Sequence, residues 1–213
     1  MQINLHLAFM QHLEHLCKDK KLKAIIDLQQ PCVLQKKKQV WLHLCASIMS
    51  QQLSTKVADV IYNRFLNLFP KRKPTLQSVI DLPFETLRGI GLSNAKTNYV
   101  KNVCEFFLKE NITDAMLHKM DNEELINYLT QIKGVGQWTV EMILMFTLGR
   151  EDILALDDLG IQQGMIKLYK IKAENKKVLR EKMLKHAQNW SPYRTYACRY
   201  LWGWKDAPTP KGD

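Results

Sequence analysis

Two features in the middle of the chain combine residue types that can do chemistry. Gly134-Val135-Gly136 is a glycine-rich turn, and a pair of carboxylates, Asp157 and Asp158, follows it along the chain. Glycine permits positive φ and leaves backbone N–H groups uncovered, so such a turn and the N-terminus of the next helix can hold a phosphate. A carboxylate beside a bound nucleotide can act on it chemically. Two simpler interpretations stay open: an ordinary helix connection at the glycines and a helix N-cap at Asp158.

Helices should position both features. Asp121 with Glu124 has the D-x-x-E spacing of a helix start, and apolar residues recur at helical spacing up to the glycines. A second helix is expected from Gln137 to Leu148. It is apolar on most sides, which predicts a buried helix.

Helical periods also dominate the rest of the chain, which predicts an all-α fold. A second glycine turn, 87–93, precedes another helix that begins after Ser93. The other expected helices are one or two in 5–28, Val40–Met49, one capped by Ser54 with the apolar stripe Val57, Ile61, Phe65 and Leu68, and one starting at Thr75. The last segment, about 161–205, is expected to be helical.

Composition limits the class of protein. The chain has 213 residues, 46% of them hydrophobic, and 31 Lys and Arg against 21 Asp and Glu, a net charge of +10. The excess indicates a polyanionic partner, and nucleic acid fits better than a membrane because no apolar run approaches the roughly 20 residues of a membrane span. We see no signal peptide and expect a protein that stays inside the cell, in the cytoplasm or nucleoid of a bacterium or the nucleus of a eukaryote.

The cysteines and histidines do not indicate a metal site. Five cysteines are scattered without a C-x-x-C pair, which is typical of reduced thiols in a core. His12 and His15 lie one helical turn apart and could bind a metal, but a solvated helix face is the simpler interpretation.

Five motifs in order carry a resemblance to a known family. They are Ile48-Met49-Ser50-Gln51-Gln52-Leu53-Ser54, Gly91-Leu92-Ser93-Asn94-Ala95-Lys96, the glycine turn with Trp138-Thr139, Asp157-Asp158-Leu159-Gly160, and Trp190-Ser191-Pro192-Tyr193-Arg194-Thr195-Tyr196-Ala197. Together they resemble the helix-hairpin-helix-GPD superfamily of DNA glycosylases, in its DNA-3-methyladenine glycosylase II branch. The resemblance covers about residues 5–205.

The resemblance implies two helical lobes with a DNA-binding cleft between them. Lobe one would be 36–150 and lobe two 1–35 plus 151–205, with a tail at 206–213. The implied activity is excision of alkylated purines, such as 3-methyladenine and 7-methylguanine, from a flipped nucleotide in base excision repair. The implied partner is double-stranded DNA with alkylated bases, and we expect a monomer.

The resemblance also assigns residues of the reaction. Asp158 matches the catalytic carboxylate, and Asp157 would be structural, as a cap or a hydrogen-bond partner of the backbone. Trp138 and Trp202 would form the base pocket with Met142, which replaces an aromatic residue of some relatives. Trp138 also stands where strand-cutting relatives carry a Schiff-base lysine, so lyase activity should be absent.

The remaining implied residues contact DNA or a cation. The DNA-binding hairpin would use Gly134, Val135, Gly136 and Thr139. The space left by the flipped nucleotide would be filled by Gln52 and Leu92, with Gln51 next, although Leu92 could instead anchor its own turn. The carbonyls of Thr130, Ile132 and Val135 would hold a structural Na⁺ or K⁺. We expect neither a catalytic cofactor nor an iron-sulphur cluster, since Cys198 stands alone near the C-terminus.

Two alternative functions remain at this point. The same fold could act on other lesions, such as hypoxanthine or ethenoadenine, whose neutral bases need more acid assistance. The chain could also be a non-catalytic helix-hairpin-helix DNA-binding module, which would explain the charge and the glycines but not the position of Asp158.

Overall fold

The computed structural model describes residues 11–206, and every regular element in that range is a helix. The all-α prediction is therefore confirmed for this part of the chain. The expected start of the first helix at residue 5 and the tail beyond residue 206 lie outside the described residues. Within 11–206, no helix is both long enough and apolar enough to cross a bilayer.

Contacts divide the chain into two compact units, whose described parts are 11–35 with 149–206, and 36–148. The first of these is called the terminal unit here and the second the central unit. The division falls after Leu148 rather than after residue 150, and the central unit is one continuous stretch of chain.

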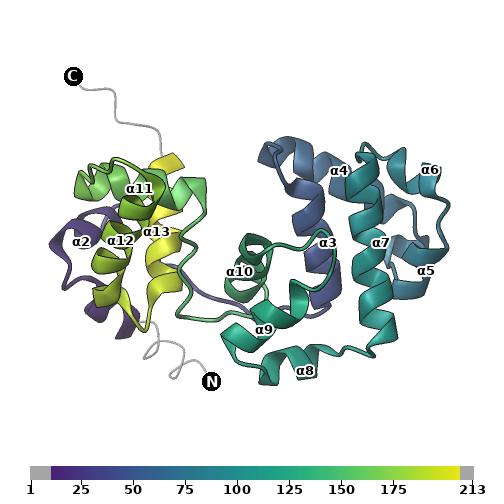
Figure 1. Ribbon diagram of the computed structural model, residues 1–213, viewed down its shortest axis with the longest axis horizontal. Helices are drawn as coiled ribbons and strands as arrows, with labels where there is room; N and C mark the ends of the chain where they lie inside the picture. The colour runs from purple at the N-terminus through teal and green to yellow at the C-terminus, as the bar shows by residue number, and fades with distance from the viewer. Residues whose placement is uncertain (1–10, 207–213) are drawn as a thin grey trace. The chain divides into compact units, whose positions relative to one another are not determined.

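The terminal unit joins the two ends of the sequence. Helix α2 packs against α11 and α13, which follow it by more than a hundred residues, and Figure 1 shows this N-terminal helix in purple beside the green and yellow C-terminal ones. The Tyr200 hydroxyl accepts a hydrogen bond from the Cys32 N–H at 3.1 Å. Tyr200 and Trp190 are almost completely buried, so these aromatic residues serve the core. The elements are α2 (Lys20–Ile26), α11 (Leu159–Tyr169), α12 (Lys176–Ala187), η2 (Gln188–Trp190) and α13 (Arg194–Asp206).

The central unit is built around α3 and α7, which pack against each other, while α10 packs on α3 and α9. Its core comes from the apolar faces of these helices, including Leu44, Ile48, Val100 and Phe107. Its elements are α3 (Val40–Ser50), α4 (Thr55–Asn67), η1 (Pro70–Arg72), α5 (Leu76–Asp81), α6 (Phe84–Arg88), α7 (Asn94–Lys109), α8 (Asp114–Lys119), α9 (Asn122–Leu129) and α10 (Gln137–Phe146).

Local helix signals have mixed outcomes. The predicted capping box is confirmed, because the Glu124 N–H donates to Asp121 Oδ1 at 2.8 Å and the Asp121 N–H to Glu124 Oε2 at 3.0 Å. The predicted stripe of α4 is wrong at its first position: Ile61 is buried, whereas Val57 is 45% exposed. A 3.6-residue period identifies the positions that share a face, but not how far along the helix a neighbour covers that face.

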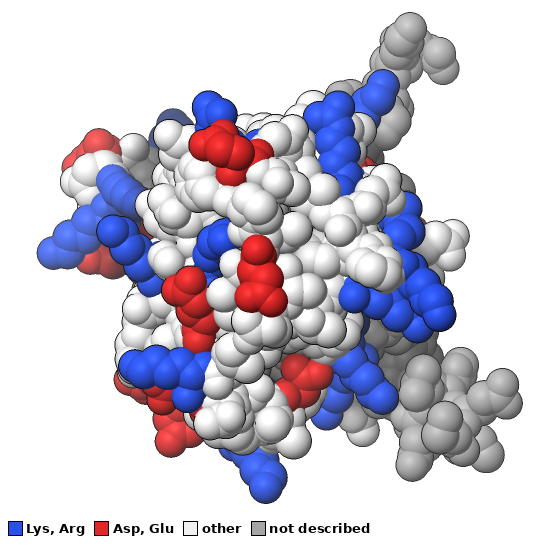
Figure 2. Space-filling model, turned by 90° about the vertical axis from the view of Figure 1, so that its right-hand side faces the viewer, with Lys and Arg blue, Asp and Glu red and all other residues white. Residues whose placement is uncertain are grey.

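The positive charge forms no single patch on the face drawn in Figure 2. Lysine and arginine side chains lie mainly around the margin of this face, and acidic side chains stand nearer its middle. The basic side chains are therefore dispersed on this side of the molecule.

Candidate active site and DNA-binding hairpin

Asp158 stands at the N-terminus of α11, in the terminal unit. It is the N-cap residue of this helix, and its Oδ1 accepts a hydrogen bond from the Ile161 N–H at 2.8 Å. The indole N–H of Trp202 donates to the same oxygen at 2.8 Å. The side chain is half-buried and is held by donors from two helices. Capping and a chemical role are therefore compatible, since a helix N-terminus also stabilises negative charge.

A glycine allows Trp202 to approach the carboxylate. A Cβ on Gly160 would lie 2.9 Å from both Cδ1 and Nε1 of Trp202 and 3.1 Å from Asp158 Oδ1. These separations are shorter than van der Waals contact, so only glycine fits between the first turn of α11 and the indole. The Leu159-Gly160 pair in the sequence motif thus has a packing reason that sequence inspection did not find.

Asp157 faces a different helix from its neighbour. Its Oδ1 pairs with Arg180 Nη1 at 2.6 Å and Lys176 Nζ at 3.1 Å, both on α12. The hydrogen bond from Arg180 is the main reason why the pKa of Asp157 lies below its ordinary value. Asp157 therefore pairs with basic side chains of α12, whereas a cap or a hydrogen bond to the backbone was expected.

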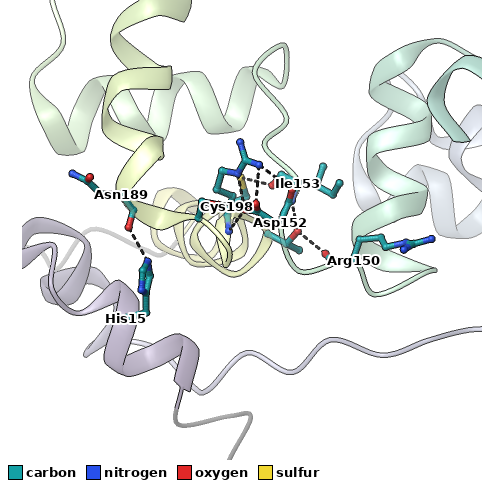
Figure 3. A network of polar contacts seen from close by, with 9 residues as sticks. His15, Arg150, Asp152, Ile153, Asn189 and Cys198 are labelled. Atoms are coloured by element: carbon teal, nitrogen blue, oxygen red, sulfur yellow. Dashed lines mark hydrogen bonds and ion pairs between the residues drawn. The ribbon is translucent and has the colours of Figure 1, made fainter. Parts of the chain in front are cut away.

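The segment before the aspartate pair is clamped to α13. Arg194 donates to Asp152 through Nε to Oδ1 at 2.6 Å and through Nη2 to Oδ2 at 2.8 Å. The Thr195 hydroxyl donates to the Arg150 carbonyl at 2.6 Å and accepts from the Ile153 N–H at 3.0 Å. In Figure 3 Asp152 and Ile153 lie beside Cys198 of α13. The Arg194-Thr195 motif thus holds the segment that leads to Asp158, a function that only the structure reveals.

Separate contacts hold the N-terminal segment. The ring nitrogen Nε2 of His15 lies 2.9 Å from the carbonyl oxygen of Asn189, a contact drawn in Figure 3. His12 is buried and stacks on the ring of Tyr196 at a centroid distance of 3.9 Å. The two histidines therefore serve packing within the terminal unit, and the solvated helix face expected for His12 is wrong.

Asp152 should stabilise the terminal unit in a pH-dependent way. Burial opposes its ionisation, but hydrogen bonds from Arg194 and Ser191 outweigh burial and lower its pKa below the ordinary value. Its stabilisation is then fully present above the unfolded-state pKa, about 3.9, and is lost as the pH falls through the lower folded-state pKa. We expect Asp152→Asn to reduce the free energy of unfolding by about 2 kcal/mol at pH 7.

Denaturant unfolding at pH 7 and at pH 3 measures this effect. Asp27→Asn is the matched control, because Asp27 forms an exposed ion pair with Lys23 on a single helix turn and should cost less than about 0.5 kcal/mol. A loss for Asp152→Asn that is equal at both pH values would contradict the assignment.

The glycine turn between α9 and α10 rests on α7. Gly134 has φ +103, and a Cβ at this position would overlap the ring of Tyr99. The Asn102 side chain donates to the Lys133 carbonyl at 3.0 Å. Two residues one turn apart on α7, Tyr99 and Asn102, thus contact the turn. The close approach of Tyr99 to the backbone requires glycine at position 134.

The other hairpin residues have distinct roles. Val135 is buried and its N–H donates to the Ile132 carbonyl at 2.9 Å, so this N–H is used within the turn. Gly136 is the N-cap of α10, is exposed, and has open space where a Cβ would stand. The first N–H groups of an α-helix have no partner within the helix, so the start of α10 at Gln137 is suited to an anion.

Thr139 is buried and contacts the loop after α3. Its hydroxyl accepts a hydrogen bond from Gln51 Nε2 at 3.2 Å. Gln52 is exposed and has φ +61, a left-handed conformation. The central unit therefore brings together the hairpin helix and the loop whose glutamines are candidates for filling a DNA void.

Leu92, unlike Gln52, is buried. Its side chain is only 6% exposed, although it lies in the second glycine turn. A side chain buried to this extent would have to leave the core to enter a DNA stack, so the structure supports the alternative that Leu92 anchors its turn.

The aromatic residues expected around a base belong to both units. Trp138 and Met142 lie one turn apart on α10, and both are half-buried. Trp202 belongs to the terminal unit and contacts Asp158 through its N–H, while its ring is half-buried. Among residues 11–206 no group of three or more His, Cys, Asp or Glu side chains could hold a metal ion.

Comparisons with known proteins agree on one family. A family profile described as "HhH-GPD superfamily base excision DNA repair protein" matches residues 45–189. DNA-3-methyladenine glycosylase 1 of Schizosaccharomyces pombe is 37% identical over 185 residues, which cover 86% of this chain and 80% of that protein.

Solved structures give the same result. The S. pombe 3-methyladenine DNA glycosylase in complex with abasic DNA matches with a TM-score of 0.80 and 34% identity, over 90% of this chain and 95% of that one. A DNA-3-methyladenine glycosidase from Bacillus halodurans has a TM-score of 0.76 and 35% identity, over 90% of this chain and 87% of that one. The chain therefore belongs to the HhH-GPD superfamily of base excision DNA repair proteins.

Proposed function

We propose that this protein is a monofunctional DNA-3-methyladenine glycosylase of type II, which hydrolyses the N-glycosidic bond of alkylated purines in double-stranded DNA. The double anchoring of Asp158 Oδ1, by the Ile161 N–H and the Trp202 indole, is the observation that carries the proposal. An N-cap alone requires only the Ile161 N–H, whereas the second donor, an indole from another helix, fixes the orientation of the carboxylate as catalysis would require. The names of the relatives support the same substrate class.

The chemistry follows from the charge of the substrate. A purine alkylated at N3 or N7 is cationic, so the base leaves as a neutral molecule with the electrons of the C1′–N bond. The sugar becomes oxocarbenium-like, and a carboxylate about 4 Å away stabilises it by roughly 4 kcal/mol at an effective dielectric near 20. The oxygen of a water then bonds to C1′ and its proton is released, with Asp158 orienting that water. The products are a free base and an abasic site.

The hairpin would hold the DNA backbone. The start of α10, with Gly134, Gly136 and the neighbouring Thr139, offers backbone N–H groups to a phosphate. The carbonyls of Thr130, Ile132 and Val135 could hold a structural Na⁺ or K⁺, as oxygen donors of the kind that hard cations prefer. Ile132 already accepts one hydrogen bond from Val135, and a carbonyl oxygen has a second lone pair for a cation.

Trp138 and Met142 of the central unit and Trp202 of the terminal unit are the side chains that would contact the base. Electron-rich aromatic faces favour a cationic base by about 0.5 to 2 kcal/mol per good contact. A tryptophan at 138 supplies no amine, so the strand should remain uncut after the base has left.

Base release from defined duplexes tests the proposal. Duplexes with 7-methylguanine, hypoxanthine or only normal bases are incubated with the protein, and the free base is separated by chromatography. We expect release of 7-methylguanine to be fastest, strand breaks to appear only after hot alkali, and borohydride to trap no adduct. Faster release of hypoxanthine would overturn the cationic specificity, and no release at all would favour the binding module.

Trp202→Phe should lower base release by about tenfold. The substitution keeps an aromatic ring but removes the N–H that donates to Asp158, and a hydrogen bond to a charged group contributes about 1.5 to 3 kcal/mol. Single-turnover rates on a 7-methylguanine duplex measure the effect. Release at the wild-type rate would show that the indole N–H does not orient the carboxylate.

Two glycines of α11 provide a second test of the contact between Trp202 and Asp158, together with its matched control. Gly160→Ala should displace Trp202 and reproduce the loss, because the added Cβ lies 2.9 Å from the indole. Gly164→Ala meets Leu201 at 3.4 Å, an ordinary contact. It should leave the rate within about twofold, since most substitutions without a specific clash have small effects.

A further inference from the structure

The loop after α3 is unusual in how its carbonyl groups are satisfied. The last carbonyls of a helix have no partner within the helix. Here the Ser50 hydroxyl donates to the Ser47 carbonyl at 2.9 Å, and the Leu53 N–H donates to the Ser50 carbonyl at 3.1 Å. The carbonyls of Met49 and Gln51 accept from a different helix.

The donor to both carbonyls is Lys96, in the first turn of α7. Its Nζ lies 3.0 Å from the Met49 carbonyl oxygen and 2.6 Å from that of Gln51. Burial lowers the pKa of this half-buried lysine, so the ammonium gives up part of its hydration to reach the loop. A cation at a helix C-terminus also interacts favourably with the helix dipole.

These contacts act on the backbone beside Gln52. Gln52 has φ +61 without being glycine, and such a conformation persists only where the surrounding contacts determine it. On one side of Gln52, Lys96 donates to the carbonyl of Gln51. On the other side, the N–H of Leu53 donates to the Ser50 carbonyl. The Gln51 side chain is occupied with Thr139, which leaves Gln52 as the exposed glutamine of the loop.

We propose that Lys96 is a positioning residue for base flipping: its ammonium fixes the Gln51–Gln52 backbone so that the Gln52 side chain is ready to occupy the space of the extruded nucleotide. The inference rests on the proposed function, because a void exists only if a nucleotide is flipped. Lys96 acts through the loop and does not touch the reacting atoms. Its loss should therefore slow excision most where the damaged base is firmly stacked and paired.

The same helix contains a matched control. Lys101 Nζ donates to the carbonyls of Ile80 and Leu82 at 2.9 and 2.6 Å, at the C-terminus of α5. Lys101 is also half-buried and satisfies two carbonyls at a helix end, but that end carries neither candidate glutamine. Replacing it should cost similar stability without disturbing the Gln51–Gln52 loop.

Four variants test the inference: Lys96→Met, Lys96→Arg, Lys101→Met and Gln52→Ala. Single-turnover release of 7-methylguanine is measured opposite cytosine and opposite a mismatched thymine, since a mismatched base is easier to flip. We expect Lys96→Met to slow release about tenfold opposite cytosine and about twofold opposite thymine. Lys96→Arg should restore most of the rate, and Lys101→Met should stay within about twofold of wild type at a temperature where all variants are folded.

Two further readouts separate the possible failures. In the Gln52→Ala background Lys96→Met should add less than about twofold, because coupled residues are not additive. Hydrogen exchange of the Leu53 amide should be about tenfold faster in Lys96→Met, which reports loop order without any base release. If the wild-type protein releases the base but Lys96→Met has no effect, or slows release equally opposite cytosine and opposite thymine, the inference alone is overturned. If the wild-type protein releases no base, the proposed function is overturned.

Discussion

Asp158→Asn should lower single-turnover release of an alkylated base by about a thousandfold, equivalent to ~4 kcal/mol of transition-state stabilisation. The amide has nearly the same shape but no charge, so it cannot stabilise an oxocarbenium-like sugar. Asparagine is also a good N-cap, so α11 should keep its start and the fold should be preserved. Affinity for duplex DNA should remain near the wild-type value.

The adjacent carboxylate provides the control. Asp157→Asn removes an equal charge one residue away, but Asp157 faces Arg180 and Lys176 on α12. We expect a small loss of stability and a base-release rate within about threefold of wild type, since partly exposed ion pairs contribute little. If both substitutions reduce the rate equally, local charge matters more than the anchored position. If Asp158→Asn keeps a near wild-type rate, the catalytic assignment is wrong.

Gly134→Ala should damage the hairpin severely. Its φ of +103 is strained for any residue with a Cβ, and the added atom would overlap the Tyr99 ring. Strain of about 1 to 2 kcal/mol plus a steric overlap of similar cost predicts a loss of about 3 kcal/mol in the free energy of unfolding. Affinity should fall for damaged and undamaged duplexes alike, because in the proposed function the hairpin would contact the phosphate backbone rather than the bases.

Gly136→Ala distinguishes folding from binding in the same turn. Gly136 has φ −96, and its Cβ would meet nothing within 4 Å. Stability should therefore stay within about 0.5 kcal/mol of wild type, while a methyl group beside the start of α10 weakens phosphate contact. Denaturant unfolding and fluorescence anisotropy measure both quantities. A stable Gly134→Ala protein with full affinity would refute the role of the hairpin, and affinity that does not fall with salt would refute a phosphate contact.

Local patterns in the sequence determined most of the helical architecture. Helix periodicity and capping act over three or four residues, so the Asp121–Glu124 capping box and the span of α3 could be predicted without knowing any neighbour. The ordered motifs were specific enough to indicate the family, which the comparisons confirmed. Asp158 could be singled out because its type and its place in a motif are visible in the sequence.

The tertiary structure alone decided which side chains meet. Asp158 and Trp202 are 44 residues apart in sequence, and Gln51 and Lys96 are 45 apart, yet each pair shares a hydrogen bond. The burial of Leu92 and the exposure of Val57 likewise depend on which helix covers each face. A periodic pattern describes one helix, whereas these contacts depend on the relative placement of two helices through a close-packed core. For that reason the sequence indicated the catalytic candidate, and the structure identified the residues that hold Asp158 in the terminal unit and the residues that hold the Gln51–Gln52 loop in the central unit.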